Sequence, residues 1–279
     1  MIAVQLKGGL GNQMFQFAAA YSLSKKFKKK LTVDLSFIET NISESDSFTP
    51  RKFGLYIFPK VNQFLINKNL GVRIKEINNS NHSSNFIFER LFGYQFILKD
   101  YFQSESFFQN YRDEVIELFN FDIKNLSEET LTILSLINSH NLISIHMRKG
   151  DYLKPKVNEF HGVVGIDFYL KAINYFKQKL YNPKFILFSD DPELAQSEFK
   201  PFLSDFFVVK NSQNKNSWID MYLMSQCYGN IIANSSFSWW GAYLNKNNNN
   251  TVIAPKKWFL KPELHKQYSN LIPQGWITL

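Results

Sequence analysis

The sequence has little that would mark a secreted, disulfide-bonded or membrane-spanning protein. It contains one cysteine, Cys227, which excludes a disulfide framework and a cluster of thiolate metal ligands. No apolar stretch approaches the roughly 20 residues that cross a bilayer, and the first residues lack the order of charges and apolar run found in a signal peptide. We therefore expect a cytoplasmic protein.

Several signatures of enzyme chemistry are also missing. The sequence has no Asp-x-Asp pair of the kind that chelates a metal, no His-Glu-x-x-His motif and no Gly-x-Ser-x-Gly turn. Its five histidines are scattered along the chain without the spacing of metal ligands. The sequence therefore predicts no metal site, and it does not match a zinc protease or a serine hydrolase.

Composition and charge narrow the class of protein. With 279 residues, 44% of them hydrophobic and 20% charged, the chain is not disordered and has room for one or two domains. The 32 basic and 24 acidic residues leave a net charge of +8, which points to an anionic partner: nucleic acid, a membrane surface or an acidic small molecule. The basic run 25–30 ends an expected helix, where cations complement the dipole. No nucleic-acid recognition motif is present, so we expect no nucleic-acid partner.

The hydrophobic pattern alternates between short strands and helices. In the first half it predicts a strand at 2–6, a glycine turn, a helix at 12–28, a strand at 31–34 and helices near 105–119 and 127–138. In the second half it predicts strands at 142–146, 185–188, 206–209, 230–233 and 251–254, with helices at 166–180, 192–199 and 217–227. This alternation is typical of an α/β fold with parallel sheets. We place a boundary near residue 140, which gives domains 1–140 and 141–279.

The glycine turn is the first segment that could bind a ligand. It reads Gly8-Gly9-Leu10-Gly11-Asn12-Gln13 between a strand and a helix. Glycines at such a place let backbone amides approach a phosphate at the positive end of the helix. A tight turn with no ligand explains the same spacing, and the residues alone do not separate the two interpretations.

The second segment follows the strand 142–146, at the end where α/β sheets bind ligands. Arg148 can direct two hydrogen bonds at a phosphate, and His146 lies two residues earlier on the same strand face. The alternative is a surface charge cluster in which Arg148 pairs with Asp151.

Two further segments lie at expected strand ends. In Ser189-Asp190-Asp191-Pro192 an aspartate can cap the next helix or bind a ribose or base. The last segment contains small hydroxyl side chains that suit either a helix cap or a phosphate site, and the two are compatible because they use the same amides. It comprises Asn234, Ser235, Ser236, Phe237 and Ser238. The following Trp239 and Trp240 suit a packed core.

Taken together, these segments resemble the α-1,2-fucosyltransferases of bacterial glycan synthesis, glycosyltransferase family 11. The likeness rests on four motifs that occur in the expected order and span nearly the whole chain. They are Gly8 to Gln16, His146-x-Arg148-x-Gly150-Asp151-Tyr152, Phe188 to Asp191, and Ser235 to Ala242. The chain departs from the family at Lys149, where a second arginine is usual, so the charge is kept and a bidentate fork is lost.

The resemblance implies a GT-B fold, in which two Rossmann-like domains face each other across a cleft. Domain 1–140 would be the acceptor side and domain 141–279 would bind GDP-fucose. The family likeness also implies an inverting transfer to the 2-hydroxyl of a terminal galactose, with GDP-fucose as co-substrate and no metal or other cofactor. A transferase of this fold using another GDP-sugar is one alternative, and a basic nucleic-acid-binding protein is an alternative of a different class.

The resemblance also implies roles for individual residues. Arg148 would contact the β-phosphate, His146 and Asp220 the guanine, and the glycine turn would face the donor from the first domain. The donor-binding set is Gly9, Asn12, Gln13, His146, Arg148, Asp191, Asp220, Asn234, Ser235, Ser236, Phe237 and Ser238.

Asp151 and His161 are the candidates for a catalytic base, beside Arg148 in the catalytic set. Asp151 can instead pair with Arg148, and His161 can instead bind the acceptor. A loose transition state would make a strong base unnecessary. The charge also suits peripheral contact with the anionic inner membrane, while the sequence specifies neither the acceptor glycan nor the oligomeric state.

Overall fold

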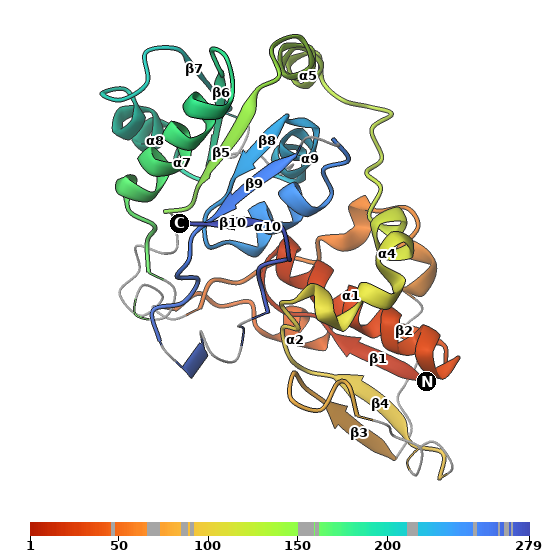
Figure 1. Cartoon of the computed structure of the whole chain (residues 1–279). Helices are drawn as coiled ribbons and strands as arrows, with labels where there is room; N and C mark the ends of the chain where they lie inside the picture. The colour runs from red at the N-terminus through yellow and green to blue at the C-terminus, as the bar shows by residue number, and fades with distance from the viewer. Residues whose placement is uncertain are drawn as a thin grey trace. The chain divides into compact units, whose positions relative to one another are not determined.

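A computed structural model gives the fold of the chain as two compact units (Figure 1). It describes residues 1–45, 48–65, 73–84, 89, 92–149, 159, 162–210, 217–247, 250–261, 263–264, 268 and 270–279. The first unit comprises Met1–Glu44 and Thr49–Asp122, and the second comprises Ile123–Leu279 with Ser45–Phe48. The division falls before helix α5 (Glu128–His140), which contacts α9 (Trp218–Gln226) of the second unit. The sequence places the boundary at the other end of this helix.

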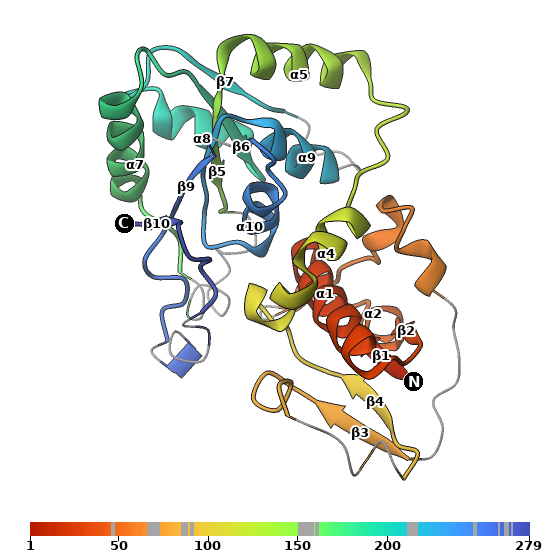
Figure 2. The same ribbon diagram turned by 45° about the vertical axis from the view of Figure 1, so that its right-hand side comes forward.

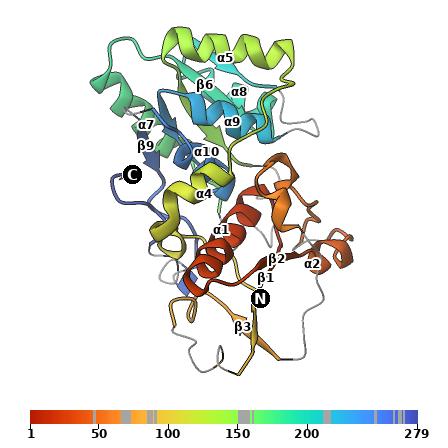
Figure 3. The ribbon, with the colours of Figure 1, turned by 90° about the vertical axis from the view of Figure 1, so that its right-hand side faces the viewer.

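A parallel sheet of four short strands forms the base of the first unit. The strands are β1 (Ile2–Gln5), β2 (Leu31–Asp34), β3 (Ile74–Ile77) and β4 (Gln95–Leu98), in the order β2-β1-β4-β3. The helical segments are α1 (Leu10–Phe27), α2 (Ser36–Thr40), α4 (Arg112–Leu118) and the 3-10 turns Leu55–Ile57, Asn62–Phe64, Glu105–Phe107 and Gln109–Tyr111. Figure 3 shows α1 running alongside β1 and β2, which it contacts.

Helix α1 is the best-buried element of this unit. Phe15 and Phe17 are buried and pack against the rings of Phe108 and Phe119, at centroid distances of 6.4 and 6.1 Å. The helix ends at Lys28, whose backbone is left-handed with φ 52°, and the last turn carries two lysines. The expectation that the basic run ends a helix is therefore confirmed, since these cations lie at its negative pole.

The second unit contains a six-stranded parallel sheet. Its strands are β5 (Ile143–Met147), β6 (Phe185–Ser189), β7 (Phe206–Val208), β8 (Gly229–Ile231), β9 (Thr251–Ala254) and β10 (Ile277–Thr278), in the order β10-β9-β8-β5-β6-β7. Numbered from β5, this is the strand order 3-2-1-4-5-6 of a nucleotide-binding fold, with the reversal between β5 and β8. The prediction of an α/β protein with Rossmann-like parallel sheets is confirmed.

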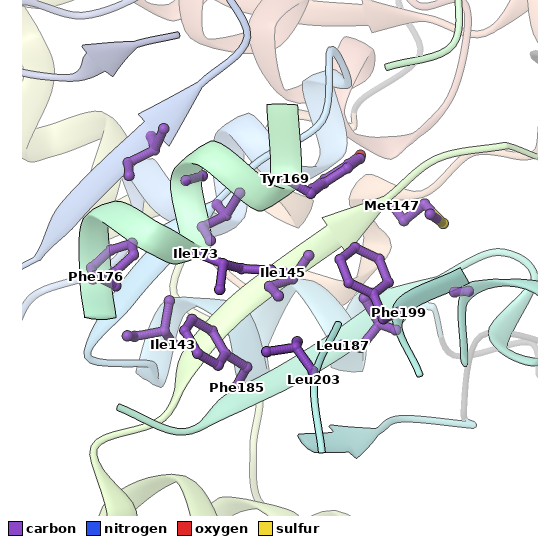
Figure 4. Packing of buried hydrophobic residues seen from close by; sticks show 14 residues of the cluster. Ile143, Ile145, Met147, Tyr169, Ile173, Phe176, Phe185, Leu187, Phe199 and Leu203 are labelled. Atoms are coloured by element: carbon purple, nitrogen blue, oxygen red, sulfur yellow. The ribbon is translucent and has the colours of Figure 1, made fainter. Parts of the chain in front are cut away.

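Four helices lie along the second sheet: α9, α7 (Ile166–Lys179), α8 (Pro192–Phe199) and α10 (Ser236–Tyr243). Helix α5 packs on α9. In Figure 2, α7 lies on one side of the sheet and α9 and α10 lie on the other. Figure 4 shows Ile143 and Ile145 of β5 packed beneath Ile173 and Phe176 of α7, with every one of these side chains at most 2% exposed.

A buried polar network occupies the opposite face of β5 and β8. The Asn230 side chain donates hydrogen bonds to Ser144 Oγ (2.6 Å) and to the Met224 carbonyl (2.8 Å), and it accepts one from Asn245 Nδ2 (3.0 Å). It thereby joins β8 to β5, to α9 and to the segment after α10. These bonds fix the register of β8 next to β5, because an asparagine displaced along the strand would leave its partners unsatisfied.

Replacing Asn230 with alanine is expected to destabilise the second unit by about 2–3 kcal/mol, because the buried Ser144 hydroxyl loses its partner and the Met224 carbonyl and the Asn245 amide each lose one of their hydrogen bonds. Urea unfolding followed by circular dichroism measures the change. Asn138→Ala, on the exposed surface of α5, is the matched control and is expected to be neutral or slightly stabilising. Equal effects of the two substitutions would contradict a role of Asn230 in strand register.

Candidate functional site

The topology of the second unit collects polar residues at one edge of its sheet. All strands are parallel, so their carboxyl ends share an edge, and the helices that lead back from it begin there. Arg148 follows β5, Asp190 follows β6 and Ser235 follows β8, while Asp220 lies in the first turn of α9. The strand order reverses between β5 and β8, which is where open α/β sheets bind their ligands.

Arg148 is held by an aspartate from the neighbouring strand. Its Nη1 lies 3.2 Å from Asp190 Oδ2, and the other oxygen of Asp190 accepts a hydrogen bond from the Lys149 amide at 3.0 Å. The Lys149 ammonium pairs instead with Glu198 of α8. Asp190 and Glu198 are not among the predicted site residues, although the pairing of Met147 with Ser189 places Arg148 opposite Asp190.

His146 is the last but one residue of β5 and is 4% exposed. Its ring centre lies 5.8 Å from that of Phe237, and its Nδ1 is buried with no hydrogen-bond partner among the described residues. Burial, and then the nearby charge of Arg148, lower the pKa of His146 to about 3. The imidazole is therefore neutral at physiological pH, and its unpartnered Nδ1 can donate or accept a hydrogen bond with a ligand, depending on the tautomer.

Asp220 is a second buried polar side chain whose bonding is incomplete. It is 4% exposed, and its Oδ1 has no hydrogen-bond partner in the described part of the chain. Burial raises the pKa of Asp220 to about 7. A buried carboxylate oxygen without a donor is costly in a folded protein, so this atom points to a ligand that supplies N–H or O–H groups.

The serine turn between β8 and α10 presents the start of that helix. Ser235 caps it, because Ser235 Oγ accepts a hydrogen bond from the Phe237 amide at 3.3 Å. Ser236 and Phe237 are partly exposed, whereas Ser238 is buried and donates to the Ser235 carbonyl at 3.2 Å. The helix-cap interpretation is confirmed for Ser235. The first turn of α10 carries no acidic residue, so its amides favour an anion.

Asn234 and the two tryptophans connect this turn to the rest of the second unit. Asn234 Nδ2 donates to the carbonyls of Gly162 and Trp258, both at 3.2 Å, and so joins the turn to two other loops. Trp239 and Trp240 are fully buried, and Trp239 Nε1 donates to the Leu271 carbonyl at 2.9 Å. The expected core role of both tryptophans is confirmed.

Asp191 caps helix α8. Its Oδ1 accepts a hydrogen bond from the Leu194 amide at 3.0 Å, and its own amide donates to Ser189 Oγ at 3.0 Å. The helix-cap interpretation is thus confirmed for Asp191, and its contact with the donor stays a prediction. In this motif Asp190 is the aspartate that reaches Arg148.

The glycine turn of the first unit is a tight strand-to-helix turn. Gly8 has φ +76°, a backbone conformation that favours glycine, and a Cβ there would lie 2.6 Å from Asn12 Nδ2, so a larger residue would strain the turn and displace the Asn12 side chain. Gln13 is buried and bonds three backbone groups: the carbonyls of Gly8 and Lys52 and the amide of Gly54. Gln13 therefore holds the turn to the 52–54 segment, whereas we expected a ligand contact.

Gly9 and Asn12 remain at the surface of the turn. A Cβ on Gly9 would meet no described atom within 4 Å, and Asn12 is partly exposed with its Oδ1 accepting a bond from Gln103 at 2.7 Å. Lys7, which the sequence did not single out, donates to the Lys99 carbonyl at 3.3 Å and lies 4.5 Å from the Tyr101 ring centre. Burial lowers the pKa of this lysine.

The remaining two candidates, Asp151 and His161, lie outside the described residues. Nothing in the geometry therefore bears on a catalytic base. Among the helices of the described residues, none is long and apolar enough to cross a membrane.

Comparison with known proteins gives the same family over the full length. The sequence model of glycosyl transferase family 11 matches residues 1–279. The O-antigen biosynthesis glycosyltransferase WbnK of Escherichia coli is 36% identical, over 98% of this chain and 99% of its own length. An Escherichia coli alpha-1,2-colitosyltransferase is 31% identical, over 100% and 99%. Human galactoside alpha-(1,2)-fucosyltransferase 1 is 27% identical, over 50% of this chain and 40% of its own.

Solved structures of fucosyltransferases also align with the chain. NodZ alpha-1,6-fucosyltransferase soaked with GDP-fucose has a TM-score of 0.45 at 18% identity, covering 87% of this chain and 92% of NodZ. A variant of Arabidopsis thaliana FUT1 in complex with GDP has a TM-score of 0.46 at 13% identity, covering 94% of this chain and 72% of that one.

Replacing Asp220 with asparagine is expected to stabilise the free protein at pH 8, by up to about 4 kcal/mol. The pKa of Asp220 is higher in the folded protein than in the unfolded chain. At a pH above the unfolded pKa, burying the ionised carboxylate therefore lowers the stability of the fold. The parent therefore loses stability as the pH rises from about 4 to about 7, and the variant does not.

Urea unfolding of both proteins between pH 5 and pH 8 measures this difference. Asp113→Asn, at a side chain that is 96% exposed, is the control and should change stability little at either pH. A parent that is more stable than Asp220→Asn at pH 8 would show that the Asp220 carboxylate has a stabilising partner.

Proposed function

Because the chain belongs to glycosyl transferase family 11, we propose that it transfers L-fucose from GDP-β-L-fucose to the 2-hydroxyl of a terminal galactose. The proposal includes inversion at the anomeric carbon and independence from metal ions. The first unit would bind the acceptor glycan and the second would bind the donor. Support for the donor side comes from the residues at the carboxyl edge of the second sheet.

The observation that carries the proposal is the pair of buried, unpartnered polar atoms at this edge. Asp220 Oδ1 is an acceptor without a donor, and His146 Nδ1 has no partner among the described residues. Guanine offers N1–H and N2–H side by side, and one carboxylate can accept both, whereas adenine has no such pair of donors. The neutral His146 suits another atom of the same base. Guanine would therefore satisfy groups that the protein leaves unsatisfied.

The diphosphate suits the neighbouring positive groups. The first turn of α10 offers backbone amides and the positive pole of a helix, and Ser236 and Phe237 are partly exposed there. Arg148 follows the adjacent strand and supplies a guanidinium with the planar geometry that matches phosphate oxygens. We assign Arg148 to the β-phosphate.

These groups would stabilise the transition state through the leaving group. As the acceptor oxygen bonds to C1 of fucose, the bond from C1 to the β-phosphate oxygen breaks and its electron pair leaves with GDP. Negative charge grows on the diphosphate, where Arg148 and the α10 amides stand preorganised. Attack from the opposite face converts the β-linked donor into an α-linked product. The acceptor hydroxyl loses its proton to a base, for which Asp151 and His161 stay the candidates.

The acceptor is proposed from the same relatives. A surface polysaccharide repeat or an oligosaccharide ending in galactose would be the substrate. The excess of basic residues suits a peripheral position at the anionic inner membrane, where lipid-linked glycans are made.

Arg148→Ala is expected to lower kcat at least about a hundredfold while the protein stays folded, which is the scale of losing one charge-stabilising donor. The measurement is GDP release from GDP-fucose with lactose or another galactoside as acceptor. Arg112→Ala, at a half-exposed arginine of α4, is the matched control and should keep the parent rate. A parent-like rate for Arg148→Ala would remove this residue from the mechanism.

Donor choice and metal independence can be tested together. GDP-fucose, GDP-colitose and GDP-mannose are offered separately, each with and without excess EDTA, and the linkage of the product is determined by NMR. We expect an α-1,2-fucosyl product whose rate EDTA does not change. The second candidate is colitose, which is fucose without its 3-hydroxyl, because a full-length relative is a colitosyltransferase. Exclusive use of another GDP-sugar would overturn the assignment of fucose, and loss of activity in EDTA would overturn the metal-free mechanism.

A further inference from the structure

We propose that Asp190 is a positioning residue that holds the Arg148 guanidinium in place for the donor diphosphate. This inference rests on the proposed role of Arg148 and adds a residue that the functional assignment does not require.

The sheet register brings these two residues together. His146 pairs with Phe188 and Met147 with Ser189 in the parallel ladder of β5 and β6, so the next residue of each strand, Arg148 and Asp190, leaves the sheet at the same level. Asp190 Oδ2 lies 3.2 Å from Arg148 Nη1, and both side chains are mostly buried, at 20% and 23% exposure.

Asp190 fixes the main chain as well as the side chain. Its Oδ1 accepts the Lys149 amide at 3.0 Å while its Oδ2 faces Arg148, so one carboxylate bonds both the end of β5 and the side chain at that end. A guanidinium on a flexible stem loses conformational freedom when it binds a phosphate. Holding it beforehand removes part of that cost, which is the sense in which Asp190 positions Arg148.

The pairing of two cations with two carboxylates also indicates that Asp190 positions Arg148. Arg148 and Lys149 are consecutive cations, and each is matched by one carboxylate from the β6–α8 segment, Asp190 for the first and Glu198 for the second. Pairing Lys149 on α8 separates the two cations. A guanidinium has five N–H donors in a fixed plane, so an arginine can contact a carboxylate and a phosphate oxygen at the same time.

A double-mutant cycle tests this inference. The proteins are the parent, Asp190→Asn, Arg148→Ala and the double variant, and the readouts are kcat, KM for GDP-fucose and the thermal unfolding midpoint. Asparagine keeps an oxygen for the Lys149 amide, so the fold should survive. We expect Asp190→Asn to lower kcat by about 10–100-fold, the scale of a misplaced reacting group. The double variant should then lie within about threefold of Arg148→Ala, because Asp190 acts through Arg148.

Asp205→Asn is the matched control, because it removes the charge of an aspartate paired with Lys184 near the amino ends of β6 and β7. It should leave kcat near the parent value. Two results would overturn the positioning role of Asp190 but not the proposed role of Arg148. One is a parent-like kcat for Asp190→Asn. The other is a double variant whose decrease in kcat equals the product of the two single decreases. Parent-like kcat for Arg148→Ala would overturn both this role and the proposed mechanism. If Asp190→Asn unfolds, Asp190→Ser takes its place in the cycle, with the same expected and contrary outcomes.

Discussion

Parallel pairing of β5 with both β6 and β8 is the constraint on which the site depends. It carries three segments that are far apart in the chain to one edge: Arg148, Asp190 and the serine turn that begins at Ser235. The reversal of strand order at this point separates the helices that lead from β5 and β8 to opposite faces of the sheet. The Asn230 network holds β8 at its register, so a polar group deep in the sheet determines where the serine turn stands.

The two faces of β5 have different chemistry: one packs in the hydrophobic core, and the other carries polar side chains. Toward α7 the strand presents Ile143 and Ile145 to a core of closely packed aliphatic and aromatic groups. Toward α9 and α10 it presents Ser144 and His146, the second of which is buried with an unpartnered nitrogen. A folded protein keeps such groups only where another interaction compensates for them, and the proposed guanine site would provide that compensation.

Much of this arrangement could be predicted from the sequence, because strands of the second unit are nearly continuous apolar runs and each is followed by polar residues. The predicted strands near 143–147 and 185–189 and the role of Ser235 as a cap are confirmed. Strand β3 could not be recognised, since it is largely exposed and lies in a polar, Asn-rich stretch. Strand β4 could not be recognised for another reason: its apolar run, Phe96 to Leu98, is buried but too short to indicate a strand by itself. The hydrogen-bond partners of Asp190 and Gln13 depend on the register of strand pairing and on contacts between residues far apart in the chain, and neither can be read from one sequence.

The strand order also sets when the site can exist during synthesis. β5, β6 and β7 are neighbours in sequence and can pair as they emerge, but β8 joins β5 only after residue 229 has been made. Until then β5 is an edge strand with its backbone groups open on one side, a template for wrong pairing. Arg148 and the serine turn can therefore meet only after the chain has been made as far as Ser235, long after β5 itself.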